Sequence, residues 1–179
     1  MSASASAQRP EESKANEKAI IELTRRMSRF WDAGDAVGYA EQFGEHSDYV
    51  AFDGTWLHGR QANAAHHSKL FQTVLKSSRL VFEEPTIVRF ISGDLAIMHA
   101  KGSVLMPWQD HVTAKRRSIQ TYVVCRGADG RWLIEAFHNT RDRPRTLPRG
   151  IALRLILIAM RLRSYLRLGY PHQPVGRPT

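Results

Sequence analysis

The chain has 179 residues, a length that suits one domain of ordinary size. Hydrophobic residues make up 42% and charged residues 24% of it, which is typical of a soluble globular protein and excludes a wholly disordered or collagen-like chain. The net charge of +9 is concentrated at one end, because residues 141–179 contain nine Arg and one acidic residue and leave a balance of only +1 for residues 1–140. A nucleic-acid-binding domain usually spreads its basic residues over a folded face with aromatic side chains between them, so this distribution argues against a nucleic-acid partner.

The sequence offers little for a disulfide, a metal or a cofactor. Cys125 is the single cysteine, so a disulfide scaffold and a Cys-cluster metal site are excluded, and a reducing, cytoplasmic location is the default expectation. His66 and His67 are adjacent and diverge on a helix, unlike the i, i+4 pair of a helical zinc site. The sequence contains no G-x-G-x-x-G motif, so we expect neither a metal nor a nucleotide cofactor.

The first part of the chain is predicted to be helical after a disordered start. Residues 1–16 are small and polar, which predicts a disordered segment. From Glu17, apolar residues recur three and four apart and predict a helix, which Gly34 suits as a C-cap. Asp35 suits the N-cap of a second, short helix, and a third helix is predicted over residues 59–76.

The middle of the chain is predicted to form strands, because the apolar period changes from helical spacing to two. The turn Ser92-Gly93-Asp94 separates two of them and indicates a hairpin. Helices followed by an antiparallel meander predict an α+β domain, with helices packed on one face of a curved sheet. The predicted strands are 46–52, 80–91, 95–105, 117–126 and 132–140.

The C-terminal segment, residues 146–179, is predicted to hold a basic amphipathic helix and a polar tail. Residues 147–168 carry apolar side chains at helical spacing with Arg residues beside them. The longest uncharged run, 155–160, is far below the roughly 20 residues of a membrane span. Two alternatives remain: peripheral contact of residues 147–168 with the inner membrane surface, where Arg side chains meet anionic headgroups, or docking on the body or a partner subunit.

Short motifs occur in a fixed order within residues 17–145. They are Trp31 with Gly34-Asp35, Asp53-Gly54-Thr55-Trp56 with Gly59-Arg60, Leu70-Phe71, His99-Ala100 with Gly102, Thr121, Gly130-Arg131-Trp132, and the run from Ala136 to Arg141. In this set the chain resembles the SnoaL-like branch of the NTF2-like superfamily and, within it, the SgcJ/EcaC group. The resemblance implies a cone of three helices on a strongly curved, mainly antiparallel sheet around one apolar pocket, often in a homodimer. Members isomerise ketosteroids, cyclise polyketides, open epoxides or only bind, so it implies a small apolar ligand but no particular reaction.

Histidines on apolar faces are the candidates for acid/base chemistry in such a pocket. His67 shares a helix face with Leu70 and Phe71, and His138 alternates with Trp132 and Ile134 along a strand. We predict His67 and His138 as catalytic residues. The alternatives are a core histidine bonded to the backbone for His67 and a residue on the sheet face for His138. The predicted ligand-binding residues are Trp31, Trp56, His99, Thr121, Trp132 and Asn139.

Two functions stay open at this point. The first is an enzyme using His acid/base chemistry on an apolar polycyclic or carbonyl-bearing substrate. The second is a non-catalytic ligand-binding or accessory domain, brought to a membrane or a partner by its basic C-terminal helix. No carboxylate in the sequence is an evident buried acid or base, which argues against an isomerase or cyclase.

Overall fold

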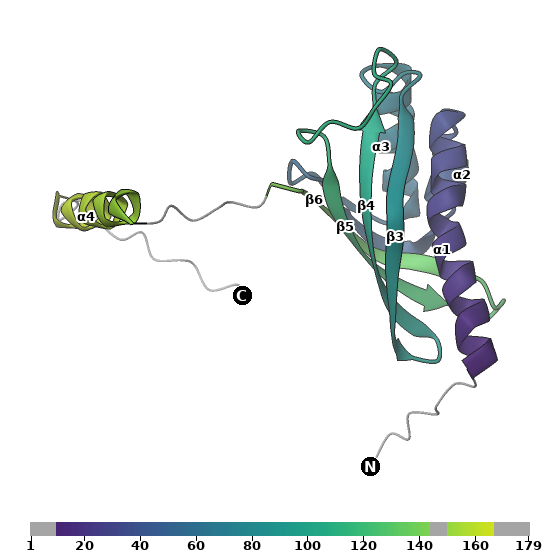
Figure 1. The fold of residues 1–179 in the computed structure, drawn as a ribbon. Coiled ribbons are helices and arrows are strands. Elements are labelled where there is room, and N and C mark those ends of the chain that lie inside the picture. Colours follow the sequence, from purple (N-terminus) through teal and green to yellow (C-terminus); the bar gives the residue numbers. More distant parts are fainter. Residues whose placement is uncertain (1–9, 144–149, 167–179) are drawn as a thin grey trace, which may run out of the picture. The chain divides into compact units, whose positions relative to one another are not determined.

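The structure, a computed structural model, describes residues 10–143 and 150–166 (Figure 1). It divides into two compact units, Met1–Arg143 and Pro144–Thr179. The helices of the first unit are α1 (Pro10–Asp32), α2 (Ala36–Ala40) and α3 (Arg60–Gln72). Its strands are β1 (Phe43–Val50), β2 (Trp56–His58), β3 (Arg79–Ser92), β4 (Leu95–Leu105), β5 (Ser118–Arg126) and β6 (Trp132–Arg141).

The six strands form one curved sheet in the order β2-β1-β6-β5-β4-β3, and every neighbouring pair is antiparallel except β1 and β6. Figure 1 shows the three helices gathered on one face of this sheet. The α+β class and the predicted packing of three helices on a curved, mainly antiparallel sheet are therefore confirmed. Strand β2, which has only three residues, was not predicted because it is too short for a period-two pattern.

Helix α1 starts earlier than predicted. It begins at Pro10, within the segment 1–16 for which we expected disorder, while residues 1–9 lie outside the described residues. Pro suits the first helical position, and Glu11 and Glu12 complement the positive end of the helix dipole. Asn16 is buried, so the helix gains tertiary contacts that a polar stretch of sequence does not reveal.

The turn between α1 and α2 follows its predicted chemistry. Gly34 has a φ of 68°, the left-handed conformation of a helix C-terminus. The Asp35 side chain accepts a hydrogen bond of 2.8 Å from the backbone N–H of Gly38 and so caps α2. Local sequence therefore determines this corner, which places Trp31 and Tyr39 in edge-to-face contact with ring centroids 5.5 Å apart.

The core lies between α1 and the inner face of the sheet. Ile20, Leu23 and Met27 of α1 are fully buried, as are Met98 of β4 and Tyr122 of β5. Because side chains alternate between the two faces of a strand, the residues next to these buried positions point outward. The outer face therefore carries an aligned row in which His99 pairs with Thr121, and Thr121 pairs with His138.

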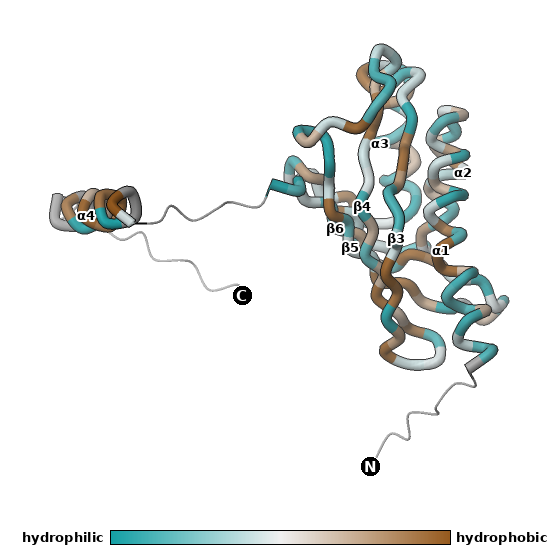
Figure 2. Tube along the Cα trace, viewed as in Figure 1, coloured by the Kyte–Doolittle hydropathy of each residue, from teal (hydrophilic) through white to brown (hydrophobic). Residues whose placement is uncertain are grey.

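The second unit contains α4 (Ile151–Leu166), predicted over residues 147–168. Residues 147–149 and 167–168 of that prediction lie outside the described residues. Figure 2 shows α4 as mostly hydrophobic. No helix in the described ranges is both long and apolar enough to cross a membrane.

Candidate functional site

A cavity of about 300 Å³ opens among α1, α3 and the strands β1, β4, β5 and β6. Its volume is at the lower end of the range for small-molecule sites. A space of about 30 Å³ shares part of its lining and reaches the buried rings of Tyr122 and Phe137. Eight of the eighteen lining residues are apolar or aromatic: Trp31, Tyr49, Ala51, Phe52, Leu70, Val74, Leu75 and Val104.

Polar groups without partners lie in the lining of this cavity. The side-chain oxygens of Asn139 and Ser103 are buried and have no hydrogen-bond partner within the described ranges. Gln120 also lines the cavity, and its Oε1 accepts a bond of 2.6 Å from the Tyr122 hydroxyl. A buried polar atom without a partner costs roughly 1–3 kcal/mol, so a ligand that bonds Asn139 or Ser103 relieves this cost.

His67 lies in the wall of the cavity within an aromatic cage. Its side chain is 1% exposed, and its ring centroid lies 4.7 Å from that of Tyr39 and 5.2 Å from that of Tyr49. Nδ1 is 3.0 Å from the carbonyl oxygen of Asn63. Since a carbonyl can only accept, Nδ1 carries the proton and Nε2 keeps its lone pair. Burial lowers the pKa of His67 to about 4, so the ring is neutral at pH 7.

The three residues His99, Thr121 and His138 do not line the cavity, which corrects the prediction made for them. His99 and His138 are exposed on the outer face, where His99 Nδ1 lies 3.1 Å from Thr121 Oγ1. The cause on β6 is a β-bulge, because Val123 pairs with Ala136 and Val124 with Ile134, leaving Glu135 between them.

The bulge reverses the face on which the later residues of β6 lie. Trp132 and Ile134 are buried before it, whereas Phe137 is buried after it and Asn139 lines the cavity. Simple alternation from Trp132 would instead have placed His138 inside the cavity. The bulged Glu135 fits because its carboxylate lies where Gly44 lacks a side chain.

The tryptophans predicted as ligand-binding residues have three different surroundings. Trp31 lines the cavity, and its Nε1 donates a buried hydrogen bond of 3.0 Å to Ser78 Oγ. Trp56 is 70% exposed and donates to Asp48 Oδ1 at 2.9 Å, so it is not part of the cavity. Trp132 is buried but lines a separate hollow of about 450 Å³. Of the residues predicted for the site, the structure therefore brings together Trp31, His67 and Asn139.

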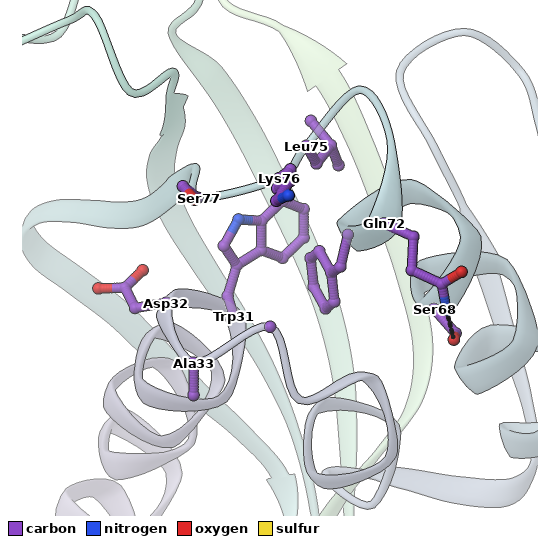
Figure 3. Close-up of a pocket in the computed structure, with 10 residues that line it drawn as sticks. Trp31, Asp32, Ala33, Ser68, Gln72, Leu75, Lys76 and Ser77 are labelled. Carbon is purple, nitrogen blue, oxygen red and sulfur yellow. Dashed lines mark hydrogen bonds between the residues drawn. The ribbon is translucent and has the colours of Figure 1, made fainter.

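A further hollow, of about 330 Å³, also has Trp31 in its lining (Figure 3). Within the described residues, none of its lining side chains has a buried polar atom without a partner. Asp32 Oδ1 accepts from the backbone N–H of Leu80 at 2.9 Å, and Gln72 Nε2 donates to Ser68 Oγ at 3.2 Å. This hollow offers a ligand fewer unsatisfied groups than the cavity does, so the cavity is the candidate site.

Charged residues at the cavity were missed in the sequence. Arg116, Arg141, His66 and Asp53 all line it. Burial, followed by the nearby positive charge of Arg116, lowers the pKa of Arg141, and Asp53 acts in the opposite direction. Arg141 lies two residues after Asn139 and therefore on the same face of β6. Its place in the cavity could have been predicted from this spacing only if the bulge had been known. Within the described ranges, no group of three or more His, Cys, Asp or Glu side chains could hold a metal ion.

The fold and the cavity define an α+β protein whose curved sheet and helices enclose a ligand-sized hollow. No protein-family model matches the sequence, and no curated protein matches it. A domain of unknown function with a cystatin-like fold from Nostoc punctiforme is 35% identical, with a TM-score of 0.66 over 85% of this chain and 94% of that one. The chain therefore belongs to the same family as this domain of cystatin-like fold.

Two further solved structures share the fold. An NTF2-like protein from Novosphingobium aromaticivorans is 22% identical, with a TM-score of 0.60 over 81% of this chain and 90% of that one. A protein from Catenulispora acidiphila, in complex with S-DNPA, is 18% identical, with a TM-score of 0.62 over 72% of this chain and 95% of that one.

Proposed function

We propose that this protein binds an apolar, ring-containing small molecule with a hydroxyl or carbonyl group in the cavity between α3 and the sheet. The observation that carries the proposal is the pair of buried, unpartnered oxygens of Asn139 and Ser103 beside the apolar and aromatic part of the cavity wall. The Asn139 oxygen can accept from a ligand hydroxyl, and the Ser103 hydroxyl can donate to a ligand carbonyl. Trp31 and Tyr49 supply flat surfaces for a ring system. The ligand complex of the Catenulispora acidiphila protein and the SgcJ/EcaC resemblance also support it.

Binding has more support than catalysis. An enzyme working in this cavity would use His67 as its acid/base group, because His138 lies on the outer face. A general base works best when its pKa is near the working pH. With a pKa of about 4, His67 is suited to accept a hydrogen bond at Nε2 and orient a ligand, and it is a weak proton acceptor.

Replacing Asn139 by Leu tests the proposal, because the change removes the unpartnered side-chain oxygen and keeps a similar volume. We expect the full chain carrying Asn139→Leu to bind 2-naphthol, measured by displacement of the fluorescent probe N-phenyl-1-naphthylamine, about tenfold more weakly. Its free energy of unfolding in urea should be unchanged or higher, because a buried polar group has been removed. Native mass spectrometry of the purified wild type would show whether a small molecule is already bound.

Two further variants show whether the probe is in the cavity. Leu70→Trp fills part of it and should abolish probe binding, whereas Val37→Trp adds the same side chain at an exposed site outside the cavity. Equal probe affinities in the wild type and Leu70→Trp would refute a ligand site at this place.

A second proposed property is attachment of α4 to an anionic membrane surface. Within its own unit, the large apolar side chains Ile151, Leu155–Ile158, Met160 and Leu162 are 46–77% exposed. The helix also carries Arg154 and Arg161 and contains no acidic residue. Apolar side chains combined with Arg favour the boundary between headgroups and acyl chains.

Co-sedimentation with liposomes tests this attachment. We expect the full chain to sediment with vesicles containing phosphatidylserine and to be released as salt rises. The double variant Ile158→Glu/Leu162→Glu should lose most of this binding, while Val37→Glu, a matched change outside α4, should keep it. If both variants sediment with the vesicles to the same extent, membrane attachment through α4 would be refuted. Docking of α4 on a protein surface, such as the partner in the predicted homodimer, would then be favoured.

A further inference from the structure

We infer that the ligand of this cavity carries a carboxylate, held at the cavity mouth by the guanidinium groups of Arg116 and Arg141. The inference rests on the proposed function and names the class of ligand: an organic acid with an apolar ring body. It goes beyond the hydroxyl or carbonyl recognition proposed for Asn139 and Ser103.

Arg141 is held in place by contacts with uncharged groups. Its Nη1 donates to the carbonyl oxygen of Arg116 at 3.1 Å and to Ser118 Oγ at 3.5 Å. Its guanidinium lies over the ring of Phe52, with Cζ 3.7 Å from the ring centroid. Both hydrogen-bond acceptors are uncharged, and within residues 10–143 no carboxylate forms an ion pair with Arg141. A guanidinium fixed in this way is ready to bind an anion without losing further rotamer freedom.

Arg116 adds a second positive charge close by. It is half-buried and lines the same cavity, and no ion pair to its side chain occurs in the described part of the first unit. The positive charges of Arg116 and Arg143 both lower the pKa of Arg141, because like charges repel each other. Two like charges in a partly buried site repel each other, and a ligand carboxylate placed between the two guanidinium groups relieves that repulsion.

Among the described residues, Asp53 is the carboxylate whose charge acts on Arg141 in the opposite direction, and it has another role. Its Oδ1 accepts a hydrogen bond of 3.0 Å from the backbone N–H of Thr55 and closes the turn after β1. Asp53 is exposed and therefore screened by water. The mouth of the cavity thus keeps an excess of positive charge. The planar guanidinium fork matches a carboxylate, which it can bind through two parallel hydrogen bonds.

The test compares 2-naphthoate with 2-naphthamide, which have the same shape and differ in charge. Each competes with N-phenyl-1-naphthylamine for the full chain, and displacement is measured by fluorescence. We expect naphthoate to bind at least about tenfold more tightly than naphthamide, with an advantage that shrinks as salt rises. The advantage should fall to about one in the double variant Arg116→Gln/Arg141→Gln.

Arg143→Gln is the matched control, since it removes the same charge nearby from a residue that is exposed and outside the lining of the cavity. It should keep most of the advantage of naphthoate.

Binding of the uncharged probe by every variant shows that the cavity is intact. The single variant Arg116→Gln removes no side-chain hydrogen bond of the described structure. Equal affinities for naphthoate and naphthamide, or an advantage that persists in the double variant, would overturn the inference. If the uncharged probe binds normally in those cases, the proposed function stands; if the probe does not enter the cavity, the proposed function itself fails.

Discussion

The variant His67→Phe should lose much less stability in acid than the wild-type protein does. The pKa of His67 is about 4 in the folded protein and about 6.5 in the unfolded chain, so the unfolded state binds the proton more readily. The stability that comes from keeping His67 neutral in the folded protein is fully present above pH 6.5 and is lost as the pH falls towards 4. The difference between the folded and unfolded pKa values of His67 corresponds to about 3 kcal/mol of stability. Urea denaturation between pH 7 and pH 4 should show a smaller fall in the free energy of unfolding for His67→Phe than for the wild type.

A second substitution in the same cage separates titration from loss of packing. Phe71 contacts His67 with ring centroids 5.9 Å apart and cannot bind a proton. Phe71→Leu should lower the free energy of unfolding by a similar amount at every pH, leaving the wild-type dependence on pH in place. Identical pH dependence in the wild type and His67→Phe would show that His67 is not held neutral by burial.

Replacing Trp31 by Ala should produce the largest loss of stability among changes at the site. Trp31 is 6% exposed, and its ring makes edge-to-face contacts with Tyr39, His67 and Phe71 at centroid distances of 5.1–5.6 Å. Truncating a buried Trp costs roughly 3–5 kcal/mol, because the contacts are lost and a void remains. The ring also lines both the cavity and the hollow of about 330 Å³ that Figure 3 shows, so the void would open into each of them. Urea denaturation measures the first effect and probe binding the second.

Two comparisons make this prediction specific. Trp31→Phe keeps an aromatic ring but loses the hydrogen bond to Ser78, and should cost less than Trp31→Ala. Trp56→Ala removes a Trp that is largely exposed, and should cost less than about 1 kcal/mol. A cost for Trp56→Ala as large as that for Trp31→Ala would contradict the distinction that the structure draws between these two residues.

Much of the fold could be predicted because its elements depend on short-range chemistry. Gly34 and Asp35 identify a helix end and a helix start, since one adopts a positive φ and the other caps with its carboxylate. The hairpin at Ser92-Gly93-Asp94 joins β3 and β4 where expected. The early start of α1 could not be predicted, because residues 10–16 are polar and Asn16 is buried through contacts with the rest of the fold.

The site could be predicted only in part, and β6 shows why. His67 and Trp31 were identified from helical spacing, which is regular enough to indicate one face. On β6 the same reasoning selected His138, yet one extra residue at Glu135 moved Asn139 inward and His138 outward. A bulge depends on how two strands pair, so it cannot be counted from one strand alone.

The sequence alone determined the class of fold, the helix caps, the strand order along the chain and the concentration of positive charge after residue 140, because each depends on neighbours in the chain. The tertiary structure decided which side chains meet. It placed Arg141 of β6 beside Arg116 of the loop before β5, and it enclosed His67 among rings from other elements. The charge at the cavity mouth and the neutrality of His67 follow from burial and from distances between remote residues, which exist only once the chain has folded.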